Sequence, residues 1–166
     1  MGDLILIGLP ASGKTTAGRL LAQRLDMPFF DCDEAIEAAA GCSVSDIFAR
    51  HGEAYFRELE HRTLEMLCHK EGCVIATGGG AVLREDNRLL LRSSGTVFWL
   101  DRPLADIMST NFQTGRPLLA AGREALERLA AERRALYAAC AHYRIAEPLL
   151  ELAISQIEEI WKGARP

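Results

Sequence analysis

The residues with the clearest chemical meaning lie near the N-terminus, in the run Gly8-Leu9-Pro10-Ala11-Ser12-Gly13-Lys14-Thr15. This run matches the pattern G-x-x-x-x-G-K-[ST], in which backbone N–H groups of a glycine-rich turn point at phosphate oxygens. The lysine of such a turn reaches the β- and γ-phosphates of a nucleotide, and the hydroxyl after it can bind Mg²⁺. Chance produces the match in roughly one chain in a hundred of this length. We therefore predict a nucleotide-binding site here.

Two carboxylates, Asp31 and Asp33, follow the short apolar run 28–30, which predicts a strand. Side chains two residues apart on a strand face the same side, so both carboxylates could point into one cleft. One could hold Mg²⁺ through water or accept a hydroxyl proton, and the other could hydrogen-bond a polyol. In the competing interpretation, Asp33 is only the N-cap of the following helix. Taken alone, these residues favour that second interpretation.

Two further groups have both a plain and a functional interpretation. Arg57 and Glu60 are three residues apart in a predicted helix, and spacing alone favours a solvated surface ion pair. In the alternative, Glu60 orients Arg57 to grip a substrate carboxylate with both of its N–H arms. The triplet Gly78-Gly79-Gly80 follows a predicted strand. It could be a flexible turn, or it could let the backbone approach a ligand closely.

The elements that must position these residues alternate along the chain. Short apolar runs predict strands at 4–7, 28–30, 73–76, 96–100 and 143–145. Apolar spacing of three and four residues predicts helices at 14–25, 33–40, 43–50, 53–70, 85–93, 123–140 and 149–161. Residues 110–122 contain Gly, Pro, Asn and Thr and predict a mobile loop. Such alternation forms a mainly parallel sheet covered on both faces, with ligands at the carboxyl ends of the strands.

Composition limits the class of protein. The 166 residues fit one domain, and 49% hydrophobic with 25% charged residues is typical of a globular protein. A net charge of −4 argues against nucleic acid as a partner, and no apolar run is long enough to predict a membrane span. The five cysteines form no C-x-x-C pair, and the N-terminus lacks a signal-peptide pattern. We therefore expect neither disulfides nor a zinc site. We also expect a cytoplasmic location and a monomer.

Together the motifs resemble one family. The phosphate loop is followed, in the order and spacing of shikimate kinases, by Asp31-x-Asp33, Gly52-Glu53-x-x-Phe56-Arg57-x-x-Glu60, Gly78-Gly79-Gly80 and Arg116-Pro117-Leu118-Leu119. The resemblance covers nearly the whole chain. It implies an α/β three-layer sandwich with a five-stranded parallel sheet, a P-loop nucleoside-monophosphate-kinase-like fold and a mobile lid at about 110–122. It also implies Mg²⁺-dependent transfer of the γ-phosphoryl of ATP to the 3-hydroxyl of shikimate, in the biosynthesis of chorismate and aromatic amino acids.

The resemblance further implies the roles of individual residues. The catalytic residues would be Lys14, Asp31, Asp33 and Arg116, with Thr15 and Asp31 at the metal. ATP would be bound by Ala11, Ser12, Gly13, Lys14, Thr15, Thr16 and Arg116. Shikimate would be bound by Asp33, Arg57, Gly78, Gly79, Gly80 and Arg133, with 33–60 as the substrate-binding helical segment. Arg133 is preferred to Arg134 because it precedes Tyr137 by four residues, as in the family's Arg-x-x-x-Tyr pattern.

Two departures from the family pattern lie on the adenine side. Ser109 stands where many members carry an arginine, seven residues before Arg-Pro-Leu-Leu, and the loop between Ile145 and Pro148 is short. These departures concern nucleotide affinity and base preference rather than the reaction. A gluconate-type kinase and a non-catalytic nucleotide-binding homologue remain the alternatives. Arg102-Pro103-Leu104 repeats part of the lid motif, and we interpret it as an ordinary strand end that leads into a helix.

Overall fold

The protein is built on one parallel sheet. A computed structural model describes the backbone at residues 2–114 and 122–164, and the side chains there except at 110–114. Its strands are β1 (Asp3–Ile7), β2 (Phe29–Asp31), β3 (Val74–Ala76), β4 (Gly95–Leu100) and β5 (Tyr143–Ile145). They are joined in the order β2-β3-β1-β4-β5, and every neighbouring pair is parallel. The central strand β1 is buried at every position, which explains why its sequence is continuously apolar after Asp3.

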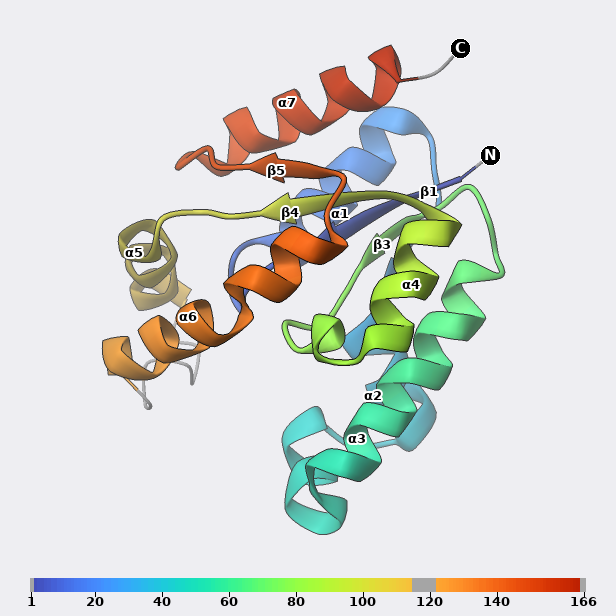
Figure 1. Cartoon of the computed structure of the whole chain (residues 1–166), viewed down its shortest axis with the longest axis vertical. Coiled ribbons are helices and arrows are strands. Elements are labelled where there is room, and N and C mark those ends of the chain that lie inside the picture. The colour runs from blue at the N-terminus through green and yellow to red at the C-terminus, as the bar shows by residue number, and fades with distance from the viewer. Residues whose placement is uncertain (1, 115–121, 165–166) are drawn as a thin grey trace.

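Helices cover both faces of this sheet (Figure 1). Leu4 and Leu6 of β1 pack under α1 and α7, while Ile5 and Ile7 face the larger core beneath the other helices. This arrangement confirms the predicted three-layer sandwich, and none of the described helices is both long and apolar enough to span a membrane. The helical elements are α1 (Lys14–Leu25), α2 (Cys32–Ala40), α3 (Val44–Cys68), the 3-10 turn η1 (Ala81–Leu83), α4 (Glu85–Ser94), α5 (Leu104–Thr114), α6 (Gly122–Cys140) and α7 (Leu150–Gly163).

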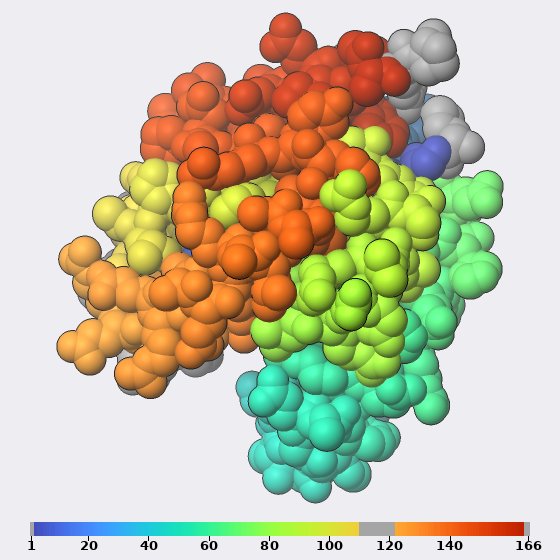
Figure 2. All heavy atoms as spheres, viewed as in Figure 1, coloured from blue at the N-terminus to red at the C-terminus, as the bar shows by residue number. Residues whose placement is uncertain are grey.

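Helix α3 changes direction at Gly52, as the two separately predicted helices implied. Gly52 has φ 81° and ψ 176°, a conformation that glycine adopts without a Cβ penalty. The first half begins with a capping box, in which Ser43 Oγ accepts from the Asp46 N–H and the Asp46 carboxylate accepts from the Ser43 N–H. This half projects from the body of the molecule (Figure 2), whereas the second half packs Leu64 into the core.

The predicted loop at 110–122 is wrong at both ends. Helix α5 continues to Thr114, and α6 already includes Gly122. The turn-favouring residue types suggested a loop, but Ile107 is buried and anchors α5 to the core. Packing of this kind outweighs the weak helix propensity of threonine and asparagine. The rest of the predicted lid, 115–121, and with it Arg116, lies outside the described residues.

Candidate functional site

The loop between β1 and α1 forms a cradle at the carboxyl edge of the sheet. Gly8 has φ 149°, and a Cβ there would lie 2.7 Å from the Leu100 carbonyl oxygen. Gly13, with φ 96°, is the N-cap of α1, so the unpaired N–H groups and the positive end of that helix open toward the loop. The adjoining pocket has a volume of about 270 Å³ and is lined by Pro10, Ala11, Gly13, Lys14, Thr15, Thr16, Asp31, Asp33, Thr77 and Gly79.

Lys14 is buried against this loop. Its Nζ donates to the carbonyl oxygens of Gly8 at 2.8 Å and of Leu9 at 2.7 Å. Burial lowers the pKa of Lys14 to about 8, against the opposing charges of Asp33 and Asp31. Because that pKa still lies above neutrality, Lys14 places a poorly hydrated positive charge beside the pocket. A transferring phosphoryl group is stabilised by such a charge.

The two carboxylates share the pocket, but not as the sequence predicted. The strand ends at Asp31 and Asp33 lies in the first turn of α2, so the expected alternation along a strand is wrong. The N-cap of α2 is Asp31, not Asp33: its Oδ1 accepts from the N–H groups of Asp33 at 3.0 Å and Glu34 at 3.2 Å. Its Oδ2 accepts from Thr15 Oγ1 at 2.6 Å, which joins α1 to α2. Both carboxylates line one pocket because α2 begins directly at the strand end.

Asp33 brings a buried carboxylate oxygen to the pocket. Its Oδ1 is buried and finds no hydrogen-bond donor among the described residues. Burial raises the pKa of Asp33 to about 6, with further increases from the charges of Asp31 and Glu60, and Lys14 opposes the rise. Asp33 is therefore mainly ionised at neutral pH and able to accept a hydrogen bond from a hydroxyl group.

Arg57 and Glu60 form a buried pair, so the interpretation as a solvated surface pair is wrong. Arg57 Nη1 donates to Glu60 Oε2 at 2.8 Å, and the two side chains are 15% and 0% exposed. The guanidinium also lies over the ring of Phe56, 5.2 Å from its centre. A Cβ at Gly80 would stand 2.3 Å from Arg57 Nη2, so Gly80 is what allows Arg57 to reach this position. The fixed guanidinium suits the carboxylate grip that the sequence left as an alternative.

The rest of the glycine triplet packs just as closely. A Cβ at Gly78 would lie 2.7 Å from Glu60 Oε1 and 3.0 Å from Asp33 Oδ1. A Cβ at Gly79 would lie 2.6 Å from the Pro10 ring in the phosphate cradle. The triplet is therefore a close-packed junction between the cradle and the buried carboxylates, not a flexible turn. Glu60 Oε1, like Asp33 Oδ1, has no hydrogen-bond donor among the described residues.

Helix α6 closes the site from the other side. Tyr137 is buried and its hydroxyl donates to the Gly79 carbonyl oxygen at 2.6 Å, while burial raises the pKa of Tyr137 to about 12. Arg133, one turn earlier, is half-buried, and its charge acts on Lys14. Its neighbour Arg134 is instead exposed and pairs with Asp101 at 3.5 Å. The structure thus brings Arg133, and not Arg134, to the predicted site.

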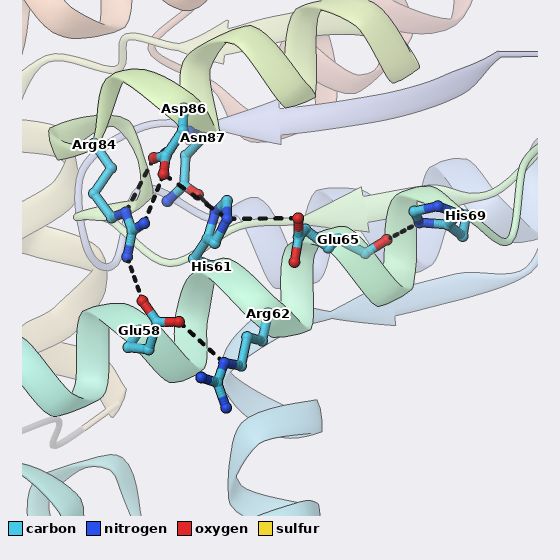
Figure 3. A network of polar contacts seen from close by, with 8 residues as sticks. All are labelled: Glu58, His61, Arg62, Glu65, His69, Arg84, Asp86 and Asn87. Atoms are coloured by element: carbon cyan, nitrogen blue, oxygen red, sulfur yellow. Dashed lines mark hydrogen bonds and ion pairs between the residues drawn. The ribbon is translucent and has the colours of Figure 1, made fainter.

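A polar network braces the second half of α3 against η1 and α4 (Figure 3). His61, next to Glu60 on α3, lies 2.6 Å from Asn87 Oδ1 through its Nδ1. Asn87 is buried at the start of α4, and its Nδ2 donates to the Ala81 carbonyl oxygen at 2.9 Å. Arg84 adds ion pairs to Glu58 at 2.9 Å and to Asp86. The segment after Gly80 is thereby tied to the helix that carries Arg57.

Two residues of the site escaped the sequence analysis. Thr77 lines the pocket and donates from Oγ1 to the Leu6 carbonyl oxygen at 3.0 Å. Its position between β3 and the glycine triplet is the sequence feature that could have identified it as a site residue. Arg102 lies, as predicted, between the end of strand β4 and the start of helix α5, but it is buried, with an exposure of 7%. Its guanidinium donates to the carbonyl oxygens of Ser12 at 3.3 Å and Pro148 at 3.2 Å. No local sequence pattern predicts contacts between residues so far apart in the sequence.

Comparison with known proteins gives one answer. Residues 10–160 match the family model described as shikimate kinase. A shikimate kinase of Symbiobacterium thermophilum is 48% identical over 149 residues, covering 86% of this chain and 85% of that protein. One from Ralstonia nicotianae is 41% identical, covering 95% and 88%. The structure of a shikimate kinase from Acinetobacter baumannii in complex with shikimate has a TM-score of 0.88, with 32% identity and coverage of 100% and 96%. The cradle, the sheet order and these relatives together show that the chain belongs to the shikimate kinase family of ATP-dependent kinases.

Proposed function

We propose that this protein transfers the γ-phosphoryl group of ATP to the 3-hydroxyl of shikimate, giving shikimate 3-phosphate and ADP. The observation that supports this best is the junction at the glycine triplet, where the phosphate cradle meets buried carboxylates and a fixed arginine. Shikimate carries a carboxylate and three hydroxyls. Guanidinium groups suit the carboxylate, and the unpartnered carboxylate oxygens suit the hydroxyls.

The donor half of the site would be built by the cradle. Ala11, Ser12, Gly13, Lys14, Thr15 and Thr16 would surround the phosphates, with backbone N–H groups and the Lys14 ammonium as donors. Thr15 Oγ1 and Asp31 Oδ2, 2.6 Å apart, are oxygen ligands suited to Mg²⁺, which keeps waters and substrate phosphates as its other ligands. Bound Mg²⁺ supplies charge neutralisation on the phosphates. We assign Lys14 and Asp31 to this half.

The acceptor half would be built around Asp33. Its unpartnered Oδ1 would accept the hydrogen bond of a substrate hydroxyl and hold that oxygen for in-line attack. Arg57 and Arg133 would grip the carboxylate, and the backbone at Gly79 would support the ring. Most of this half comes from the segment 33–60 and from the triplet Gly78, Gly79 and Gly80. Catalysis here would consist mainly of positioning and charge neutralisation.

A third contribution rests on sequence alone. Arg116 belongs to the Arg-Pro-Leu-Leu motif and would neutralise charge on the phosphates. We also infer a cytoplasmic, monomeric enzyme of one domain. A reducing location agrees with the five cysteines, all of which are free thiols.

The test is release of ADP from Mg-ATP by the purified protein with shikimate, with gluconate and without an acceptor, with the product identified by mass spectrometry. We expect release stimulated by shikimate only, and shikimate 3-phosphate as product. Stimulation by gluconate alone would replace our assignment of the acceptor. Nucleotide binding without stimulation by either compound would point to a non-catalytic homologue and reject the proposal.

A further inference from the structure

We propose that Arg102 is a positioning residue of the phosphate cradle, which holds the Ser12–Gly13 peptide so that the Gly13 N–H points into the nucleotide pocket. This inference rests on the proposed ATP site and extends it to a residue outside the phosphate-loop motif. Arg102 itself does not line that pocket.

Arg102 is buried against the phosphate cradle and donates a hydrogen bond to it. Its side chain comes from the turn between β4 and α5 and is buried beside the cradle. Nη1 donates to the Ser12 carbonyl oxygen at 3.3 Å, and a Cβ at Gly13 would lie 3.5 Å from the same nitrogen. The guanidinium therefore lies directly against the turn at which α1 begins. Burial lowers the pKa of Arg102, as expected for a cation with little access to water.

The trans geometry of the Ser12–Gly13 peptide sets the direction of the Gly13 N–H. In a trans peptide the C=O and N–H groups point to opposite sides of the chain, and the described residues contain no cis peptide bond. Fixing the Ser12 carbonyl on Arg102 therefore turns the Gly13 N–H away from Arg102. Gly13 lines the phosphate pocket and is the N-cap of α1, so this N–H belongs to the anion-binding end of the helix.

A second hydrogen bond joins Arg102 to the segment before α7. Nε donates to the Pro148 carbonyl oxygen at 3.2 Å, in the short segment between β5 and α7. One side chain therefore connects the cradle to a segment more than 130 residues away in sequence. A buried guanidinium with two fixed acceptors has little freedom to move, so the cradle is held in shape before a nucleotide arrives.

The experiment measures binding of tripolyphosphate, which has phosphates but no base, and of ADP, by titration calorimetry. In Arg102→Met we expect both affinities to fall by the same factor, tenfold or more, because the cradle loses an oriented donor. Shikimate affinity should stay within twofold. Arg102→Lys keeps the positive charge but cannot donate to both carbonyl oxygens. We therefore expect its affinities for tripolyphosphate and ADP to lie between those of wild type and Arg102→Met.

The matched control is Arg144→Met, which removes the same charge from the neighbouring strand β5. Arg144 is exposed, pairs with Asp101 at 2.6 Å and has no contact with the cradle among the interactions found in the described residues. We expect both phosphate ligands to bind this variant within twofold of wild type. An equal loss in Arg144→Met would reduce the effect to bulk charge and overturn the proposal.

Four further results would overturn it. Unchanged tripolyphosphate binding with weakened ADP binding would limit Arg102 to the Pro148 segment. An equal loss of shikimate binding would indicate a general structural defect, and if Arg102→Met does not fold, wild-type affinity in Arg102→Lys would show that two-carbonyl bonding is dispensable. Failure of wild type to bind tripolyphosphate would reject the cradle itself. None of these measurements depends on turnover, so failure of wild type to phosphorylate shikimate is a separate result.

Discussion

Arg57 Nη1 lies 2.8 Å from Glu60 Oε2, and this pair is buried against the glycine triplet. Burial raises the pKa of Glu60, and the charge and hydrogen bond of Arg57 oppose the rise. A buried pair that loses one member leaves a charge without compensation, which destabilises the fold. Arg57 therefore has two separable roles: it neutralises Glu60, and in our proposal it binds the acceptor.

We expect Arg57→Ala to lower the free energy of unfolding by about 3–5 kcal/mol and to raise the KM for shikimate at least tenfold, with little change in the KM for ATP. In Arg57→Ala/Glu60→Gln, stability should largely return while the KM stays high. Urea unfolding and initial rates measure the two effects. Glu53→Gln is the control, because Glu53 is an exposed partner of Arg57 at 3.3 Å and its loss should cost under about 1 kcal/mol. A normal KM in the double variant would exclude Arg57 from acceptor binding.

The raised pKa of Asp33 predicts two opposite effects of pH. Activity, measured as kcat/KM for shikimate, should fall as pH drops through about 6, because protonation removes the negative charge with which Asp33 binds and activates a substrate hydroxyl. Stability has the other sign: the folded state holds this proton more tightly than the unfolded chain, so ionised Asp33 destabilises the fold at neutral pH.

Asp33→Asn should therefore abolish activity yet raise the free energy of unfolding at pH 7.5, on the order of 2 kcal/mol. This gain should shrink as pH falls from about 6 toward 4, because wild-type Asp33 becomes protonated in the folded state over that range. Thermal unfolding across that pH range checks the prediction. A variant less stable than wild type at pH 7.5 would contradict the assigned cause of the shift, which is chiefly burial.

Lys14→Met should remove activity without weakening the fold. The lowered pKa of Lys14 shows that its burial as a cation is unfavourable, and methionine fills similar space without charge. We expect at least a thousandfold loss of kcat and a thermal midpoint no lower than that of wild type. Turnover near the wild-type rate would remove Lys14 from the mechanism, and exposed Lys162→Met provides the charge-matched control.

Asn87→Ala tests whether the brace around Asn87 supports the acceptor site that we propose. Its amide bonds both His61 at 2.6 Å and the Ala81 carbonyl oxygen at 2.9 Å, and both groups would lose a partner. We expect the free energy of unfolding to fall by about 1–3 kcal/mol and the KM for shikimate to rise more than the KM for ATP. Arg62→Ala, which removes an exposed pair with Glu58, should change neither. Equal changes in both KM values would show that the brace does not act on the acceptor side.

Local patterns predicted most of the fold, because buried parallel strands are apolar runs and helices have apolar residues three and four positions apart. Lys14 and the glycine triplet could be predicted for the same reason: each is recognised within a few residues. The strand alternation expected for Asp31 and Asp33 was wrong because the strand already ends at Asp31, and over so short a span a strand end and a helix start look alike. Arg102 could not be predicted, since its partners Ser12 and Pro148 are 90 and 46 residues away. Burial of Glu60 likewise depends on packing between distant segments.

The close approach of Gly79 to Pro10 keeps the phosphate cradle and the carboxylate of Asp33 around one undivided pocket. With a Cβ position at Gly79 only 2.6 Å from the proline ring, there is no room for a side chain between the two segments. Lys14, Thr15 and Asp33 line that same pocket. In the reaction we propose, the phosphoryl group can therefore pass directly from nucleotide to acceptor, without a covalent intermediate on the protein.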